Sequence, residues 1–93
     1  MEQPKIMLDE EVFRLARAKW GDQSQIDVAI EELAELTSVL IRHRRGRVGE
    51  ASVTEEIADV QICLDQLILI FGRDNYRIQR AMKMRRLYDR AKE

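Results

Sequence analysis

Residues 57–71 constrain the fold most, because they are apolar almost all round when they are placed on a helix. Ser52 and Glu55 have the spacing of a capping box just before this segment, and Gly72 directly follows it. A helix that is hydrophobic on every side needs neighbours on every side. We therefore expect a helix that begins near Ser52 and is either central in the fold or buried by a partner chain.

The remaining segments also follow a helical period. Apolar residues recur every three or four positions from residue 24 to residue 41, which predicts a long amphipathic helix. A shorter stripe covers residues 10–20, with Asp9 as its expected N-cap and Gly21 just past its end. A weaker stripe follows Asp74, which is the expected cap of a last helix. The pattern predicts four helices.

Composition agrees with an all-α fold. Four glycines and one proline are too few for the many turns of an all-β protein. A chain of 93 residues can bury only one modest core. We expect a single all-α domain over residues 1–93, a four-helix bundle.

The sparse cysteine and histidine content excludes two classes of small protein. One Cys and one His cannot build a disulfide framework or a structural zinc site. No signal-peptide pattern opens the sequence, and no apolar run approaches the ~20 residues of a membrane span. We expect a cytoplasmic protein in a reducing compartment, without membrane contact.

Charge is strongly segregated along the chain, although the net charge is only −1. Every charged side chain in residues 24–41 and in residues 49–71 is acidic. Most of the basic residues, twelve of sixteen, lie in residues 42–47 and in the tail from Arg73 onward. The small net charge argues against a protein built wholly around polyanion binding.

Two pairs of carboxylates interrupt the apolar faces. Glu32 and Glu35 are three residues apart, and Glu56 and Asp59 repeat that spacing, so each pair shares a helix face. Carboxylates that are brought together in a groove raise one another's pKa unless a cation joins them. Ligand sets made only of oxygen suit Mg²⁺ or Mn²⁺. The alternative is that these acids belong to solvated helix faces, and the spacing alone leaves both interpretations open.

The motifs EELAE at residues 31–35 and EIAD at residues 56–59 resemble the EExxE and ExxD pair of the MazG-like all-α nucleoside triphosphate pyrophosphohydrolases. The resemblance extends over most of the chain from about Lys19. The other matching residues are Trp20, Gly21, Gln25, Val60, Lys83, Arg86, Leu87 and Arg90.

This resemblance implies Mg²⁺-dependent hydrolysis of a nucleoside or deoxynucleoside triphosphate to the monophosphate and pyrophosphate. Carried over by position, the metal ligands are Glu32, Glu35, Glu56 and Asp59. Glu31 matches the first glutamate of the motif as a catalytic residue, with three roles open: a ligand of a second metal, a base that orients water, or an exposed acid. Family members also dimerise, so we expect a homodimer or a tetramer.

Substrate contacts are expected from two further places. Lys83 and Arg86 share a face of the last helix and are expected to bind phosphate oxygens, although a solvated basic face is the simpler alternative. Gln25 lies two turns before Glu32 and could reach a nucleobase, on which Trp20 could stack. For Trp20 a place in the core is the alternative.

Two other functions fit the same sequence. Phosphoribosyl-ATP pyrophosphohydrolase has the same fold and the same use of metal. A non-enzymatic helical protein that binds a partner or nucleic acid would use the arginines of residues 42–47 and the basic tail.

Overall fold

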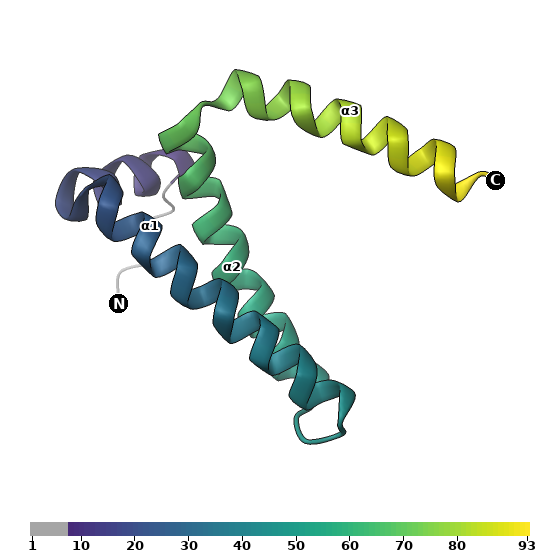
Figure 1. Cartoon of the computed structure of the whole chain (residues 1–93). Coiled ribbons are helices and arrows are strands. Elements are labelled where there is room, and N and C mark those ends of the chain that lie inside the picture. The colour runs from purple at the N-terminus through teal and green to yellow at the C-terminus, as the bar shows by residue number, and fades with distance from the viewer. Residues whose placement is uncertain (1–7) are drawn as a thin grey trace, which may run out of the picture.

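The chain is all-helical in the computed structural model, which describes residues 8–93 (Figure 1). Three helices follow one another: α1 spans Asp9–Arg44, α2 spans Glu50–Phe71 and α3 spans Arg73–Ala91. None of these helices is long and apolar enough to cross a lipid bilayer. The all-α prediction is confirmed.

Helix α1 contains both of the first two expected helices, joined by a kink at Gly21. The backbone of Gly21 has φ 82° and ψ 164°, a conformation that is essentially restricted to glycine. Across the kink, Arg17 donates hydrogen bonds from Nε and Nη2 to the two carboxylate oxygens of Asp22, at 2.6 and 3.0 Å. Gly21 therefore ends the first helical arm as predicted.

The second arm of α1 and helix α2 form an antiparallel hairpin (Figure 1). A short loop joins them, in which Gly46 has a positive φ of 72° and the His43 Nδ1 atom lies 3.0 Å from the carbonyl oxygen of Val48. The side chains buried between the helices are mostly small, so the two backbones approach closely. They are Gln25, Ala29 and Val39 from α1, with Val60 and Cys63 from α2.

The expected N-caps are wrong by one to three residues. Helix α2 begins at Glu50 with Gly49 as its N-cap, so Ser52 and Glu55 lie inside the helix and make no cap. The extended backbone of Gly49, at φ −86° and ψ 178°, already provides the N-cap geometry upstream of the capping-box motif. Likewise Asp9 and Asp74 lie in the first turns of α1 and α3, where a carboxylate favours the positive end of the helix dipole.

Helix α3 leaves the hairpin at Gly72, whose φ of 118° turns the chain away from α2 (Figure 1). It has no buried residue and contacts α2 only at the elbow. One ion pair, from Arg73 Nη2 to Glu10 Oε1 at 3.0 Å, ties its first turn to α1. The rest of α3 has no contact with the hairpin of its own chain.

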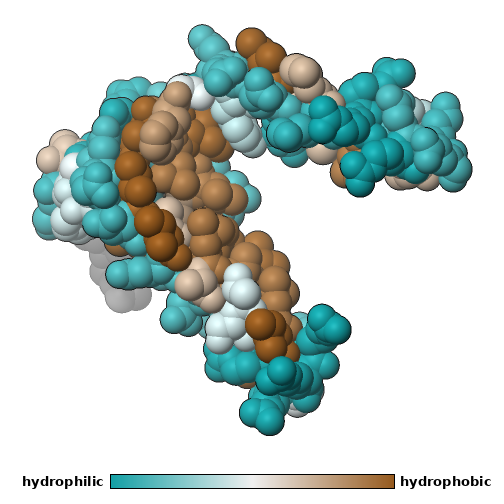
Figure 2. Space-filling model, viewed as in Figure 1, coloured by the Kyte–Doolittle hydropathy of each residue, from teal (hydrophilic) through white to brown (hydrophobic). Residues whose placement is uncertain are grey.

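Much of the apolar surface of α2 stays uncovered in one chain. Figure 2 shows a band of hydrophobic residues along the hairpin. Phe71 is 71% exposed, and Ile57 and Ile62 are also exposed. Among the described residues, only α1 packs along α2, so α2 is not central in this part of the chain.

Candidate metal centre

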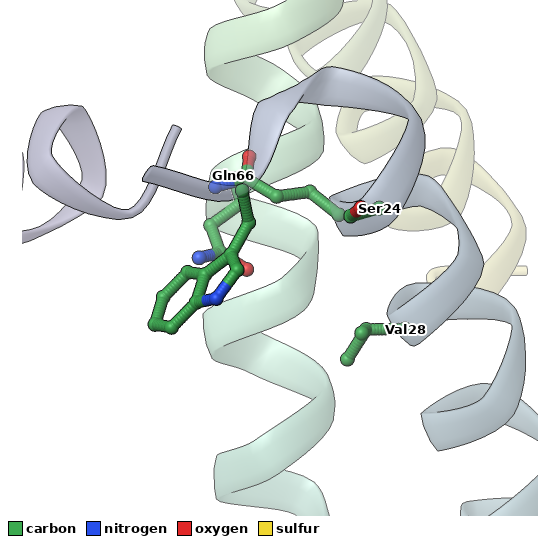
Figure 3. A pocket seen from close by; sticks show the side chains of 5 residues that line it. Ser24, Val28 and Gln66 are labelled. Carbon is green, nitrogen blue, oxygen red and sulfur yellow. The ribbon is translucent and has the colours of Figure 1, made fainter. Parts of the chain in front are cut away.

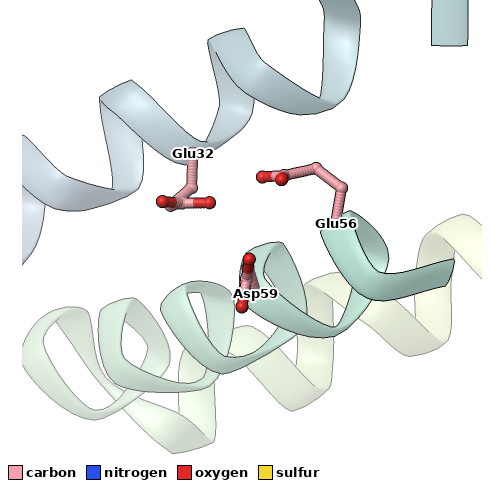
Figure 4. A group of neighbouring side chains, drawn as sticks. All are labelled: Glu32, Glu56 and Asp59. Atoms are coloured by element: carbon pink, nitrogen blue, oxygen red, sulfur yellow. The ribbon is translucent and has the colours of Figure 1, made fainter. Parts of the chain in front are cut away.

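Three carboxylates meet between the two helices of the hairpin (Figure 4). Glu32 points from α1 toward α2, and Glu56 and Asp59 point from successive turns of α2 toward Glu32. One oxygen from each lies within 4.8 Å of the other two. We call Glu32, Glu56 and Asp59 the acidic triad.

The neighbouring acids raise the pKa of Glu56. The pKa of Glu56 is raised from 4.5 to about 7, first by a hydrogen bond with Glu32 that requires a proton on one carboxyl. Partial burial and the negative charges of Glu32, Asp59 and Glu35 raise it further. The Oε1 atom of Glu56 is buried and has no hydrogen-bond partner. When all three carboxylates are ionised, their mutual repulsion is not compensated unless a cation binds between them.

No basic side chain of residues 8–93 forms an ion pair with the triad. Among residues 8–93, the acids that form ion pairs are Glu10, Asp22, Asp74 and Asp89, all outside the triad. The available donors are carboxylate oxygens, two of them on half-buried residues. This donor set fits a hard divalent cation such as Mg²⁺ or Mn²⁺.

The other two acids of the EELAE motif lie outside the triad. Glu35 is exposed, but it is near enough for its charge to raise the pKa of Glu56. Glu31 is exposed on the neighbouring face of α1. The structure thus brings together three of the four expected ligands and leaves Glu35 at the edge of the site.

A mostly apolar pocket of about 280 Å³ lies on the hairpin toward the Gly21 kink (Figure 3). Gln25 is 6% exposed, and its Nε2 atom is buried without a hydrogen-bond partner. Trp20 also lines the pocket and is 60% exposed, so it is not a core residue. The other lining residues are Ser24, Val28 and Gln66. The wall of the pocket thus contains a buried amide donor that has no hydrogen-bond partner among residues 8–93.

This pocket continues toward the acidic triad. A second hollow of about 240 Å³ is lined by Glu32 and Asp59, and it shares Val28 and Gln66 with the first. Cys63 also lines it, and burial together with the charges of the triad raises the pKa of this thiol, which keeps it protonated. The two hollows adjoin at Val28 and Gln66, and we call them together the groove.

Sequence reasoning missed Gln66, although a signal for it exists. Gln25 lies seven residues before Glu32 on α1, and Gln66 lies seven residues after Asp59 on α2. Seven residues are about two helical turns, and the two helices run in opposite directions. Both amides therefore lie two turns from the triad toward the same end of the hairpin.

The expected phosphate-binding residues are not at this site within one chain. Lys83 and Arg86 are exposed on α3, and no ion pair described for this helix involves them.

Comparison of the chain with protein-family models, with curated proteins and with solved structures finds no match. The description of the site therefore rests on the positions of its side chains and not on a known relative.

Proposed function

We propose that the chain is a Mg²⁺-dependent nucleoside triphosphate pyrophosphohydrolase, which hydrolyses its substrate to the nucleoside monophosphate and pyrophosphate. The observation that carries this proposal is the buried, unpartnered Oε1 atom of Glu56 within the acidic triad. A carboxylate oxygen in this setting requires a proton or a cation. The neighbouring groove suits a ligand with an apolar, hydrogen-bonding end and a polyanionic end.

In this proposal the acidic triad holds Mg²⁺, or Mn²⁺ in its place, and Glu35 joins from the next turn of α1. When bound, a divalent cation would supply positive charge to the phosphate oxygens and would lower the pKa of an attacking water. The carboxylates of Glu32, Glu56 and Asp59 lie between α1 and α2 and would hold the cation there. Glu31, at the rim, is the candidate to orient the water or to hold a second ion.

The nucleobase occupies the pocket near Gly21. The free Nε2 donor of Gln25 offers a hydrogen bond to an acceptor on the base edge, and the exposed indole of Trp20 offers a stacking surface. Gln66 adds a second amide on the opposite helix. The triphosphate then runs along the groove toward the acidic triad. Lys83 and Arg86, which lie away from the triad within one chain, are the expected ligands of the phosphate oxygens that the metal leaves free.

The functional unit in this proposal is a homodimer or a tetramer that completes a four-helix, MazG-like bundle. Support comes from the uncovered apolar side chains on α2 and α3, including Ile57, Ile62 and Leu87. A lone chain would present these side chains to water at a substantial free-energy cost.

A panel of nucleoside and deoxynucleoside triphosphates with Mg²⁺, together with phosphoribosyl-ATP, tests the proposal. Phosphorus NMR of the products should show pyrophosphate and a monophosphate. The Glu56→Gln variant should be inactive, whereas the neighbouring Glu55→Gln variant, which changes an exposed carboxylate, should retain activity. Orthophosphate as the sole product would contradict the proposed reaction. Salt-sensitive polyanion binding without hydrolysis would favour the non-enzymatic alternative.

A further inference from the structure

Helix α3 carries charges that its own chain does not use. It has seven basic and two acidic residues, and no residue of it is buried. The two acids pair within the helix, Asp74 with Arg77 at 4.0 Å and Asp89 with Arg85 at 3.2 Å. Lys83 and Arg86 are left exposed on one face, in the part of the chain that contacts no other element.

The acidic triad, in contrast, has negative charges without a positive partner among residues 8–93. It joins three carboxylates, and no ion pair between residues 8 and 93 reaches it. Gln25, which is 6% exposed, lines the neighbouring pocket, and its buried Nε2 atom has no hydrogen-bond partner. These features indicate a ligand site that one chain supplies with acids and amides but not with cations.

Geometry separates the two halves within one chain. Asp59 lies twelve residues before the end of α2, which is ~18 Å along that helix, and Lys83 lies ten residues after Arg73, which is ~15 Å along α3. The two helices diverge from the elbow at Gly72 (Figure 1). The basic face of α3 therefore lies far from the acidic triad of its own chain.

We propose that Lys83 and Arg86 complete the acidic site of a second copy of this chain. In a two-fold symmetric dimer, each α3 crosses the hairpin of the partner, so that both sites become complete at once. The same contact covers the apolar hollow of about 450 Å³ at the elbow, which Leu64, Phe71 and Tyr76 help to line. The role of the shared site in hydrolysis depends on the proposed function, whereas the contact itself does not.

Carbodiimide cross-linking tests the contact without any activity measurement. The reagent activates a carboxylate, and a nearby lysine amine then displaces the activating group to form an amide. Chains labelled with ¹⁵N are mixed with unlabelled chains, unfolded and refolded together, and then coupled. We expect covalent dimers in which a peptide containing Lys83 of one isotope is joined to residues 31–35 or 56–59 of the other.

The Lys83→Arg variant is the matched control, because it keeps the positive charge but removes the amine that forms the amide. It should remain a dimer by light scattering and should lose this cross-link. Cross-links of Lys83 to these residues only within single chains would overturn the proposal. A light-scattering mass of one chain at micromolar concentration would overturn it equally.

A complementation experiment with two inactive variants tests whether the shared site takes part in hydrolysis. Glu56→Gln and the double variant Lys83→Ala/Arg86→Ala are each expected to be strongly impaired. When the two are co-expressed, half of the dimers are mixed and each holds one complete site, so about a quarter of the wild-type activity should return. No recovery would show that α3 acts within its own chain. If the wild-type chain hydrolyses nothing, the proposed function fails, and the cross-link alone decides the contact.

Discussion

The hairpin and helix α3 differ in what the single chain gives them. Both consist of long helices with an apolar period, which is weaker in α3. Of the two regions, only the hairpin buries side chains and joins functional groups from separate segments. Helix α3 has an apolar stripe and a basic face, with nothing packed against either of them beyond the elbow. The comparison teaches that helical periodicity predicts a helix equally well in both regions, whereas a site forms only where two helices meet.

The largest expected effect is a loss of turnover when a carboxylate of the hairpin is changed. Glu56→Gln or Asp59→Asn should lower turnover by at least about a hundredfold, because each removes a ligand charge while nearly keeping the shape of the side chain. Steady-state pyrophosphate release measures it. The control is Glu55→Gln, on the exposed side of α2. Full activity in either triad variant would remove the acidic triad from the mechanism.

A smaller effect is expected on α3. Lys83→Ala should lower kcat/KM by roughly tenfold, the scale of one charge-assisted hydrogen bond, because Arg86 still supplies a nearby cation. The Lys83→Ala/Arg86→Ala double variant should lose considerably more. Arg77→Ala, on the same helix but paired with Asp74, is the matched control. Equal losses in the control and in Lys83→Ala would reduce α3 to a general electrostatic role.

The next effect concerns stability against pH and is confined to the hairpin. The pKa of Glu56 is about 7 in the folded chain, above its ordinary value of 4.5, so between these values the folded state binds more protons than the unfolded state. Without divalent metal, the free energy of unfolding should therefore fall as the pH rises from about 4.5 to 7. Urea unfolding across this range should show a smaller decrease for Glu56→Gln than for the wild type or Glu55→Gln. The same slope in all three would contradict the account of Glu56.

The smallest effect is expected at the amide end of the hairpin. Gln25→Leu removes a buried donor that has no partner, so it should leave the ligand-free chain as stable as before or more stable, by about 1 kcal/mol. It should at the same time raise KM for the nucleotide. Gln23→Leu, at an exposed position two residues earlier, should change neither quantity appreciably. A large loss of stability in Gln25→Leu would identify Gln25 as a structural residue.

Much of the fold could be predicted from sequence because helix periodicity and glycine positions are local signals. Gly21 and Gly72 both mark real breaks, and both have positive φ. The capping box at Ser52 failed because Gly49 adopts the N-cap conformation and starts the helix earlier. The apolar residues on all sides of α2 predict that the helix is covered, but they do not identify the covering segment. Burial depends on contacts between segments that are distant in the sequence.

The candidate site shows the same division. The three-residue spacing of Glu56 and Asp59 placed them on one face, and Glu32 meets them in the structure. The spacing does not predict that Glu35 lies outside the acidic triad, because the position of Glu35 depends on how α1 is rotated against α2. Gln66 was missed because a single amide within an apolar helix has no signal until its partner helix is known.

Thermal unfolding with and without Mg²⁺ tests the central claim most directly, namely that the acidic triad binds a divalent cation. At pH 8, millimolar Mg²⁺ should raise the melting temperature of the wild type and of Glu55→Gln, and a chelator should reverse the rise. Asp59→Asn should show little or no rise, because one triad oxygen has lost its charge. No shift in the wild type, or a shift that survives Asp59→Asn unchanged, would contradict the account.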